Sequence, residues 1–152
     1  VRMVVESTIA RRVQIDFLHR QFNVCVPAAL SGEERREAIA RAFERWYRAR
    51  AAEEIGRAVE RWAPLAGVRP ASVLVRAQRR RWGSCSATGV LRFNWRLVMT
   101  EPRLIDYVVV HELAHLRVQS HAPAFWAEVA RLLPDWKLLR RRLREIGPTL
   151  SF

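Results

Sequence analysis

Apolar and polar residues alternate near the start of the chain in a way that is typical of β-strands. Residues 13–17 alternate, and residues 22–26 do so again before Pro27. This pattern predicts two short strands joined by a turn at His19 and Arg20. We therefore interpret residues 1–30 as a short β-rich N-terminal segment.

The pattern becomes helical after this segment. The sequence Ser31-Gly32-Glu33-Glu34 has the form of a capping box, which begins helices. Apolar and aromatic residues then recur at roughly helical spacing, namely Ile39, Phe43, Trp46, Ile55, Val59 and Trp62. We expect this helix to end near Pro64, with its aromatic residues in the core.

Two further strands are predicted in the middle of the chain. Residues 73–77 and 90–95 have strand patterns, and the segment between them, residues 81–89, is rich in turn-forming residues. We expect these strands to belong to a small antiparallel sheet.

The last third of the chain has three helical patterns. Thr100 can cap the first helix, which is expected to fray near residue 118, and Ser120 can cap the second, which Pro134 stops. The third, over residues 136–146, is amphipathic. Strands followed by helices predict an α+β fold, in which residues 31–152 form one domain.

The composition narrows the class of protein. A chain of 152 residues, 50% of them hydrophobic, is long enough for a core and is not disordered. No apolar run approaches the ~20 residues that span a bilayer. The N-terminus is too short and too soon interrupted for a signal peptide, although a start at Val1 indicates a fragment or a processed chain. Because Cys25 and Cys85 follow no recurring pattern, we expect free thiols and a cytoplasmic location.

The formal net charge of +12 comes almost wholly from arginine, since Lys137 is the only lysine. Two dense runs, Arg79 to Arg81 and Arg140 to Arg142 with Arg144, could hold the phosphates of a nucleic acid. Both could equally be solvated surfaces, and we favour that interpretation because aromatic residues are not interleaved with the basic ones in the sequence.

The sequence His111-Glu112-Leu113-Ala114-His115 has a spacing that suits a divalent metal. Helical residues four apart differ by about 40° around the axis, so both imidazoles project from one face. His121, six residues further on, can complete a zinc site with an open position for water. Glu112 can take the proton of that water as it attacks a carbonyl. The pentapeptide also occurs by chance, but the apolar segment 104–110 indicates a buried helix.

Two other interpretations fit these residues less well. Metzincins have the same interval from the second to the third histidine, but they need a glycine where Val118 stands and a methionine downstream, and Met3 and Met99 both lie upstream. His121 is therefore expected in the first turn of the next helix. Cys85 could be a nucleophile or a further metal ligand, and we favour a packed residue in a tight turn.

Four ordered motifs resemble those of the YgjP-like metallopeptidase family, over about residues 40 to 147. They are Arg81-Trp82-Gly83-Ser84-Cys85, Asn94-Trp95-Arg96-Leu97, the segment 106–115, and His121-Ala122-Pro123-Ala124-Phe125-Trp126. Members of that family carry a longer N-terminal β-rich region, of which residues 1–30 would be a remnant.

The resemblance implies a zincin-like metallopeptidase core in which His111, His115 and His121 hold zinc and Glu112 is the general base. The same ligand arrangement occurs in SprT-like and Wss1-like proteases, which cut proteins crosslinked to DNA. The expected partner is a peptide or protein substrate, aligned along the edge of the sheet.

The sequence allows more than one interpretation of the oxyanion-stabilising residue and of the substrate. Arg81, Asn94 and Arg96 are candidates for stabilising the oxyanion, but a structural role is favoured for each. One rival function is the metal-dependent hydrolysis of a non-peptide substrate. Another is a nucleic-acid-binding module with structural zinc, and a DNA-associated protease would combine both activities.

Overall fold

The computed structural model describes residues 1–78 and 80–147. Contacts within the chain divide it into two compact units, Val1–Tyr47 and Arg48–Phe152, and the division falls inside helix α1 (Gly32–Ala66). The expected domain boundary at residue 31 is not tested by this division and stays a prediction. Because α1 belongs to both units, the point at which contacts divide the chain need not coincide with a domain boundary.

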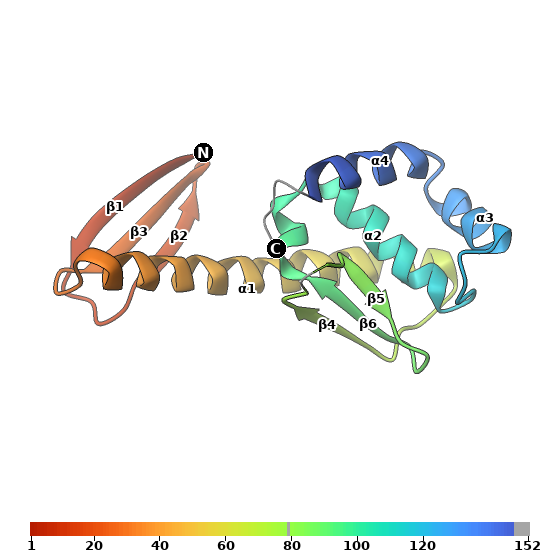
Figure 1. The fold of residues 1–152 in the computed structure, drawn as a ribbon, viewed down its shortest axis with the longest axis horizontal. Helices are drawn as coiled ribbons and strands as arrows, with labels where there is room; N and C mark the ends of the chain where they lie inside the picture. The colour runs from red at the N-terminus through yellow and green to blue at the C-terminus, as the bar shows by residue number, and fades with distance from the viewer. Residues whose placement is uncertain (79, 148–152) are drawn as a thin grey trace. The chain divides into compact units, whose positions relative to one another are not determined.

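The first unit contains a three-stranded sheet and the start of α1 (Figure 1). Its strands, in the order β1-β3-β2, are β1 (Arg2–Thr8), β2 (Gln14–Leu18) and β3 (Gln21–Pro27). The two predicted strands are confirmed as β2 and β3, which pair antiparallel through a turn where His19 and Arg20 both have positive φ. Strand β1 was not predicted, because its exposed residues show no alternation, and it pairs with β3 in parallel.

The core of this unit forms where α1 covers one face of the sheet. Val24 and Val26 of β3 are almost fully buried, and the Phe22 ring packs edge-on against Phe43 and Trp46 of α1, with ring centroids 5.1 and 5.0 Å away. The aromatic residues at the start of α1 are therefore core residues, as their spacing predicts.

The second unit contains another three-stranded sheet, in the order β4-β6-β5 (Figure 1). Its strands are β4 (Ser72–Arg76), β5 (Gly83–Cys85) and β6 (Val90–Asn94). The expectation of a purely antiparallel sheet is wrong, since β4 runs parallel to β6 and only β5 is antiparallel to it. Strand β5 is also missing from the prediction, because Gly-Ser-Cys lacks the apolar alternation by which a strand is identified.

Four helical segments follow β6 in the second unit. They are the 3₁₀-helix η1 (Trp95–Met99), α2 (Pro102–His115), α3 (Pro123–Leu132) and α4 (Trp136–Ile146). Helix α4 has the predicted bounds. The predicted caps are wrong: Thr100 ends η1 and donates to the carbonyl of Leu97, and α2 and α3 begin after Glu101 and Ala122. A proline occupies the first turn of each, where its missing N–H has no cost.

Helix α2 is the centre of the second unit. Every residue from Leu104 to Val110 is buried, and the helix contacts β5 on one side and α3 and α4 on another (Figure 1). The buried carboxylate of Asp106 accepts hydrogen bonds from Trp62 Nε1 (2.8 Å) and from Arg61, both in the last turns of α1. These contacts hold the helix that carries the histidine motif. None of the helices among the described residues is both long and apolar enough to span a membrane.

Candidate metal centre

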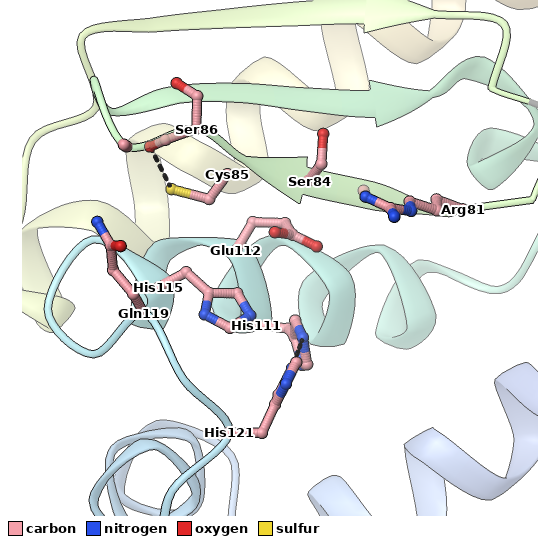
Figure 2. Close-up of a pocket in the computed structure, with 11 residues that line it drawn as sticks. Arg81, Ser84, Cys85, Ser86, His111, Glu112, His115, Gln119 and His121 are labelled. Atoms are coloured by element: carbon pink, nitrogen blue, oxygen red, sulfur yellow. Dashed lines mark hydrogen bonds between the residues drawn. The ribbon is translucent and has the colours of Figure 1, made fainter.

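Three histidine rings meet at the C-terminal end of α2 (Figure 2). His111 and His115 lie one turn apart with ring centroids at 5.0 Å, and the loop after α2 brings His121 Nε2 to 3.1 Å from His111 Nε2. One ligand nitrogen from each residue lies within 4.8 Å of the others. Two nitrogens on one tetrahedral zinc lie about 3.4 Å apart. The three rings therefore fit a single ion.

His121 reaches this group from the loop and not from a helix. The expectation that it lies in the first turn of the next helix is wrong, because α3 begins only at Pro123. The proline fixes φ at the helix start, so the chain before it is extended at Ala122 (φ −67°, ψ 168°). The extended residue leaves His121 free to turn back toward α2.

The surroundings of His115 set the orientation of its ring. Its Nδ1 lies 3.2 Å from the carbonyl oxygen of Val118, at the position where a metzincin has glycine. A proton on Nδ1 in this hydrogen bond leaves the lone pair of Nε2 free for a metal. Fully buried Phe125 packs against all three imidazoles, with centroid distances of 4.4, 4.8 and 4.9 Å. Sequence patterns gave Phe125 no role at the site.

Burial also sets the charge state of His111. It lowers the pKa of this imidazole to about 3, with smaller contributions from the charges of His115 and His121. The ring is therefore neutral near pH 7, which is the form that binds metals. Its Nδ1 is buried without a hydrogen-bond partner among the described residues.

Glu112 points away from the three rings, toward the strand that carries Ser84 (Figure 2). The residue is only 5% exposed, and burial raises the pKa of its carboxyl group to about 8, against the opposing charge of Arg81. Gly83 of β5 lies directly against it: a Cβ at Gly83 would lie 2.7 Å from Glu112 Oε1 and 2.8 Å from Cγ. A side chain at position 83 would thus displace the carboxylate.

A cavity of about 410 Å³ opens over these residues, between α2 and β5. It is lined by Arg81, Gly83, Ser84, Cys85, Ser86, Ala87, His111, Glu112, His115, Gln119 and His121. A second cavity of about 230 Å³ shares Arg81, Gly83, His111 and Glu112 with it. Its walls are mostly apolar and include Trp82, Val108 and Leu143. Both cavities therefore border the same carboxylate.

Cys85 lines the larger cavity, but it does not lie in the tight turn that was expected. It is the last residue of β5, and the turn follows at Ser86–Gly89, closed by a hydrogen bond from Gly89 N to the Ser86 carbonyl oxygen (2.9 Å). Burial, and after it the negative charge of Glu112, raises the pKa of the Cys85 thiol. A raised pKa disfavours the thiolate, and with it the nucleophile interpretation.

The three candidates for oxyanion stabilisation have different surroundings. The Asn94 side chain is fully buried, donates to the carbonyl oxygens of Gln78 and Arg81, and accepts from Arg96 N, so its role is structural. The Arg96 guanidinium lies over the Trp95 ring at 4.5 Å. Of the three, Arg81 alone lines the cavity beside Glu112, and Arg79 of the same run lies outside the described residues.

The fold is similar to that of two solved structures. The crystal structure of the metallopeptidase zymogen abylysin from Pyrococcus abyssi is similar, with a TM-score of 0.55 and 22% identity over 61% of this chain and 95% of that one. The zymogen of jannalysin from Methanocaldococcus jannaschii gives a TM-score of 0.54 and 18% identity, over 60% of this chain and 94% of that one. At these identities the likeness concerns the fold.

A search of curated proteins gave no match. The sequence does match the family described as YgjP-like, metallopeptidase domain, and the match covers residues 11–146. This range begins after β1. It includes strands β2 to β6, helices α1 to α4 and the whole candidate metal centre. The chain therefore belongs to the YgjP-like metallopeptidase family.

Proposed function

We propose that this protein is a zinc-dependent metallopeptidase in which His111, His115 and His121 hold the ion. The observation that carries the proposal is the meeting of three imidazole nitrogens within 4.8 Å, with buried Glu112 in the same cavity. Neutral imidazoles suit zinc, and three protein ligands leave the fourth position that catalysis needs.

Glu112 is the general base in this proposal. When bound, zinc supplies Lewis acidity, which polarises the substrate carbonyl and makes water more acidic. A bound cation nearby would favour the ionised form of Glu112 over the protonated form that burial favours in its absence. Ionised Glu112 accepts a proton from the attacking water as the new C–O bond forms. It then passes the proton to the amide nitrogen as the C–N bond breaks, so that the amine leaves neutral. The absence of a side chain at Gly83 supports this role, because it leaves room for the carboxylate between α2 and β5.

The sheet supports a peptide over other substrates. Strand β5 lies at the edge of the sheet order β4-β6-β5 and forms the wall of the cavity opposite α2. An extended peptide can pair with such an edge by main-chain hydrogen bonds, which would set one of its carbonyls against the histidine group. Arg81 beside Glu112 is the remaining candidate for stabilising the oxyanion.

The smaller cavity supports a preference within the peptide. It borders His111 and Glu112, and its apolar walls can bury a side chain next to the scissile bond. Burying an apolar side chain contributes roughly 1.5–3 kcal/mol. We therefore expect cleavage next to bulky apolar residues.

The test combines metal analysis with hydrolysis of casein and of a mixed peptide library. Glu112→Gln should keep about one zinc per chain and lose turnover by a factor of about 10² or more. His111→Ala should lose the zinc. His19→Ala is the matched control, because His19 lies in the turn between β2 and β3 and is not part of the group. Hydrolysis of esters but not of any peptide would refute the peptidase assignment and keep the hydrolase.

A further inference from the structure

One face of α4 carries a dense positive charge beside two tryptophan rings. Trp136, Lys137, Arg140, Arg141 and Arg144 line an open pocket of about 330 Å³. Their spacing of one, three, one and three residues places them on one side of the helix, adjacent to the side on which Leu139 and Leu143 are buried. We call this set of five residues the α4 basic face.

The charges of the α4 basic face are not balanced by carboxylates. Within residues 1–78 and 80–147, its four cations form no salt bridge. Glu145, the one acidic residue of α4, does not line the pocket. Like charges at positions i and i+4, as in Arg140 and Arg144, each destabilise a helix by a few tenths of a kcal/mol. An anionic ligand would remove that repulsion.

Several exposed arginines elsewhere in the second unit, although not all of them, pair with carboxylates. On α1, Arg50 contacts Glu54 at 2.8 Å, and Arg57 contacts Glu53. On α4 itself, Arg142 points away from the pocket and pairs with Glu101 at 3.0 Å. The unpaired charge is therefore a property of the α4 basic face and not of α4 as a whole.

Aromatic rings are interleaved with these cations in space, although not in the sequence. Trp136 stacks on Trp126 of α3, with centroids 4.4 Å apart and planes at 16°. The Arg140 guanidinium lies 4.8 Å over the Trp126 ring, and the Lys137 ammonium lies 5.7 Å from the Trp136 centroid. The stacked indoles and the cations form one continuous surface.

We propose that the α4 basic face binds single-stranded nucleic acid, with phosphates on Lys137, Arg140, Arg141 and Arg144 and a base stacked on Trp136. Cations that follow the backbone, together with an aromatic ring for a base, are the combination by which proteins hold single strands. An acidic peptide would use the cations but not the indole. The solvated-surface interpretation of residues 140–144 then holds only for Arg142.

The proposed surface adjoins the candidate metal centre. The Trp126 ring that stacks on Trp136 also stacks on His121, at 5.7 Å and 26°. A strand bound on the α4 basic face would therefore lie one indole away from the third histidine. The binding proposal does not rest on the proposed peptidase activity, because it can be measured without hydrolysis.

The test is fluorescence anisotropy of the full chain with labelled oligo(dT) at several salt concentrations. Each phosphate contact on a single strand contributes about 0.7 to the slope of log affinity against log salt. The Arg141→Ala, Arg144→Ala double variant should thus lower the slope by about 1.4 and weaken binding about ten-fold or more. The matched control is Arg50→Ala, Arg57→Ala, which removes the same charge from paired, exposed positions on α1.

The stacked base is tested separately. An abasic oligonucleotide of equal length and Trp136→Leu should each weaken binding by about five-fold or more, with an unchanged salt slope. Equal losses in both arginine double variants would overturn the site, because they would report only overall charge. Equal affinity for the abasic strand or for a poly-glutamate peptide would also overturn the proposal. The absence of oligo(dT) binding at about 50 mM salt would overturn it as well.

Discussion

Gly83 and Glu112 lie in direct contact across the cavity, and no space for a Cβ is left between them. A methyl group at Gly83 would meet Oε1, Cγ and Cδ of the glutamate at 2.7, 2.8 and 3.0 Å. The glycine therefore determines where the carboxylate lies. Its φ is not in the left-handed region, so the reason for glycine at this position is close approach and not backbone conformation.

Gly83→Ala is expected to displace Glu112 and to lower kcat/KM by about 10²-fold, since a shift of about 1 Å in a catalytic group has that effect. Zinc content should not change, because the three histidines lie on the other side of the carboxylate. The control is Gly56→Ala on α1, where an added Cβ meets nothing within 4 Å. If the Gly83 variant had the parent's kcat/KM, the glycine would have no positioning role.

The grouping of the three histidines, with Glu112 in the same cavity, could be predicted because the spacing of these residues is local. Four residues along a helix fix the geometry of His111 and His115, and only six residues separate His115 from His121. The helix bounds were also largely predictable from apolar spacing. The caps were less so, because Thr100 and Ser120 are good cap residues that the adjacent prolines override at Pro102 and Pro123.

The parts that sequence reasoning missed depend on contacts between distant segments. Strand β5 is three residues long and acquires its identity from pairing with β6, so no periodicity reveals it. The roles of Gly83 and Phe125 depend on contact with α2, which neither residue's own neighbours indicate. The interleaving of Trp126 with Arg140 is likewise visible only when α3 and α4 are packed together.

Asp106 is expected to contribute more to the stability of the second unit than its ion pair with Arg61 would contribute alone. Asp106→Ala would leave the Nε1–H of Trp62 without its partner, which costs about 1–3 kcal/mol when such a group is buried. Asp135→Ala is the matched control, because Asp135 forms an exposed pair with Arg103 at 2.7 Å, worth at most about 1 kcal/mol. Urea unfolding of both variants measures the difference. Equal losses would contradict the distinction between the two aspartates.

The metal-free protein should lose stability as pH rises from 6.5 to 8 because of Glu112. The folded-state pKa of this group is raised to about 8 from 4.5, so its stabilising contribution is full below pH 4.5 and is lost as pH rises through 8. The lowered pKa values of His111 and His115 act only below pH 6.5. Cys85 and Tyr107, with raised pKa values, stay protonated in this window.

The measurement for this pH effect is urea unfolding of EDTA-treated parent and Glu112→Gln across the same window. The free energy of unfolding of the parent should fall by roughly 1–2 kcal/mol relative to the variant, in which the group cannot titrate. Comparing the two proteins cancels the titration of every other group. Parallel profiles would show that the carboxyl group is already ionised in the folded, metal-free protein.

Leu143→Ala should broaden the substrate preference toward larger apolar side chains. Leu143 forms part of the wall of the smaller cavity, and its truncation adds space next to Glu112. One methylene in such a pocket changes selectivity by about 10-fold or more, so the ratio of kcat/KM for a phenylalanine over a leucine peptide should rise by at least that factor. Competing both peptides in one reaction makes the ratio independent of the amount of folded enzyme.

Leu139→Ala is the control, because Leu139 is buried one turn earlier on α4 but does not line the cavity. Truncating either leucine should destabilise the fold by about 2–5 kcal/mol, but only the change at Leu143 should alter the ratio. An equal shift in both variants would mean that loosened packing, and not this cavity, sets the preference.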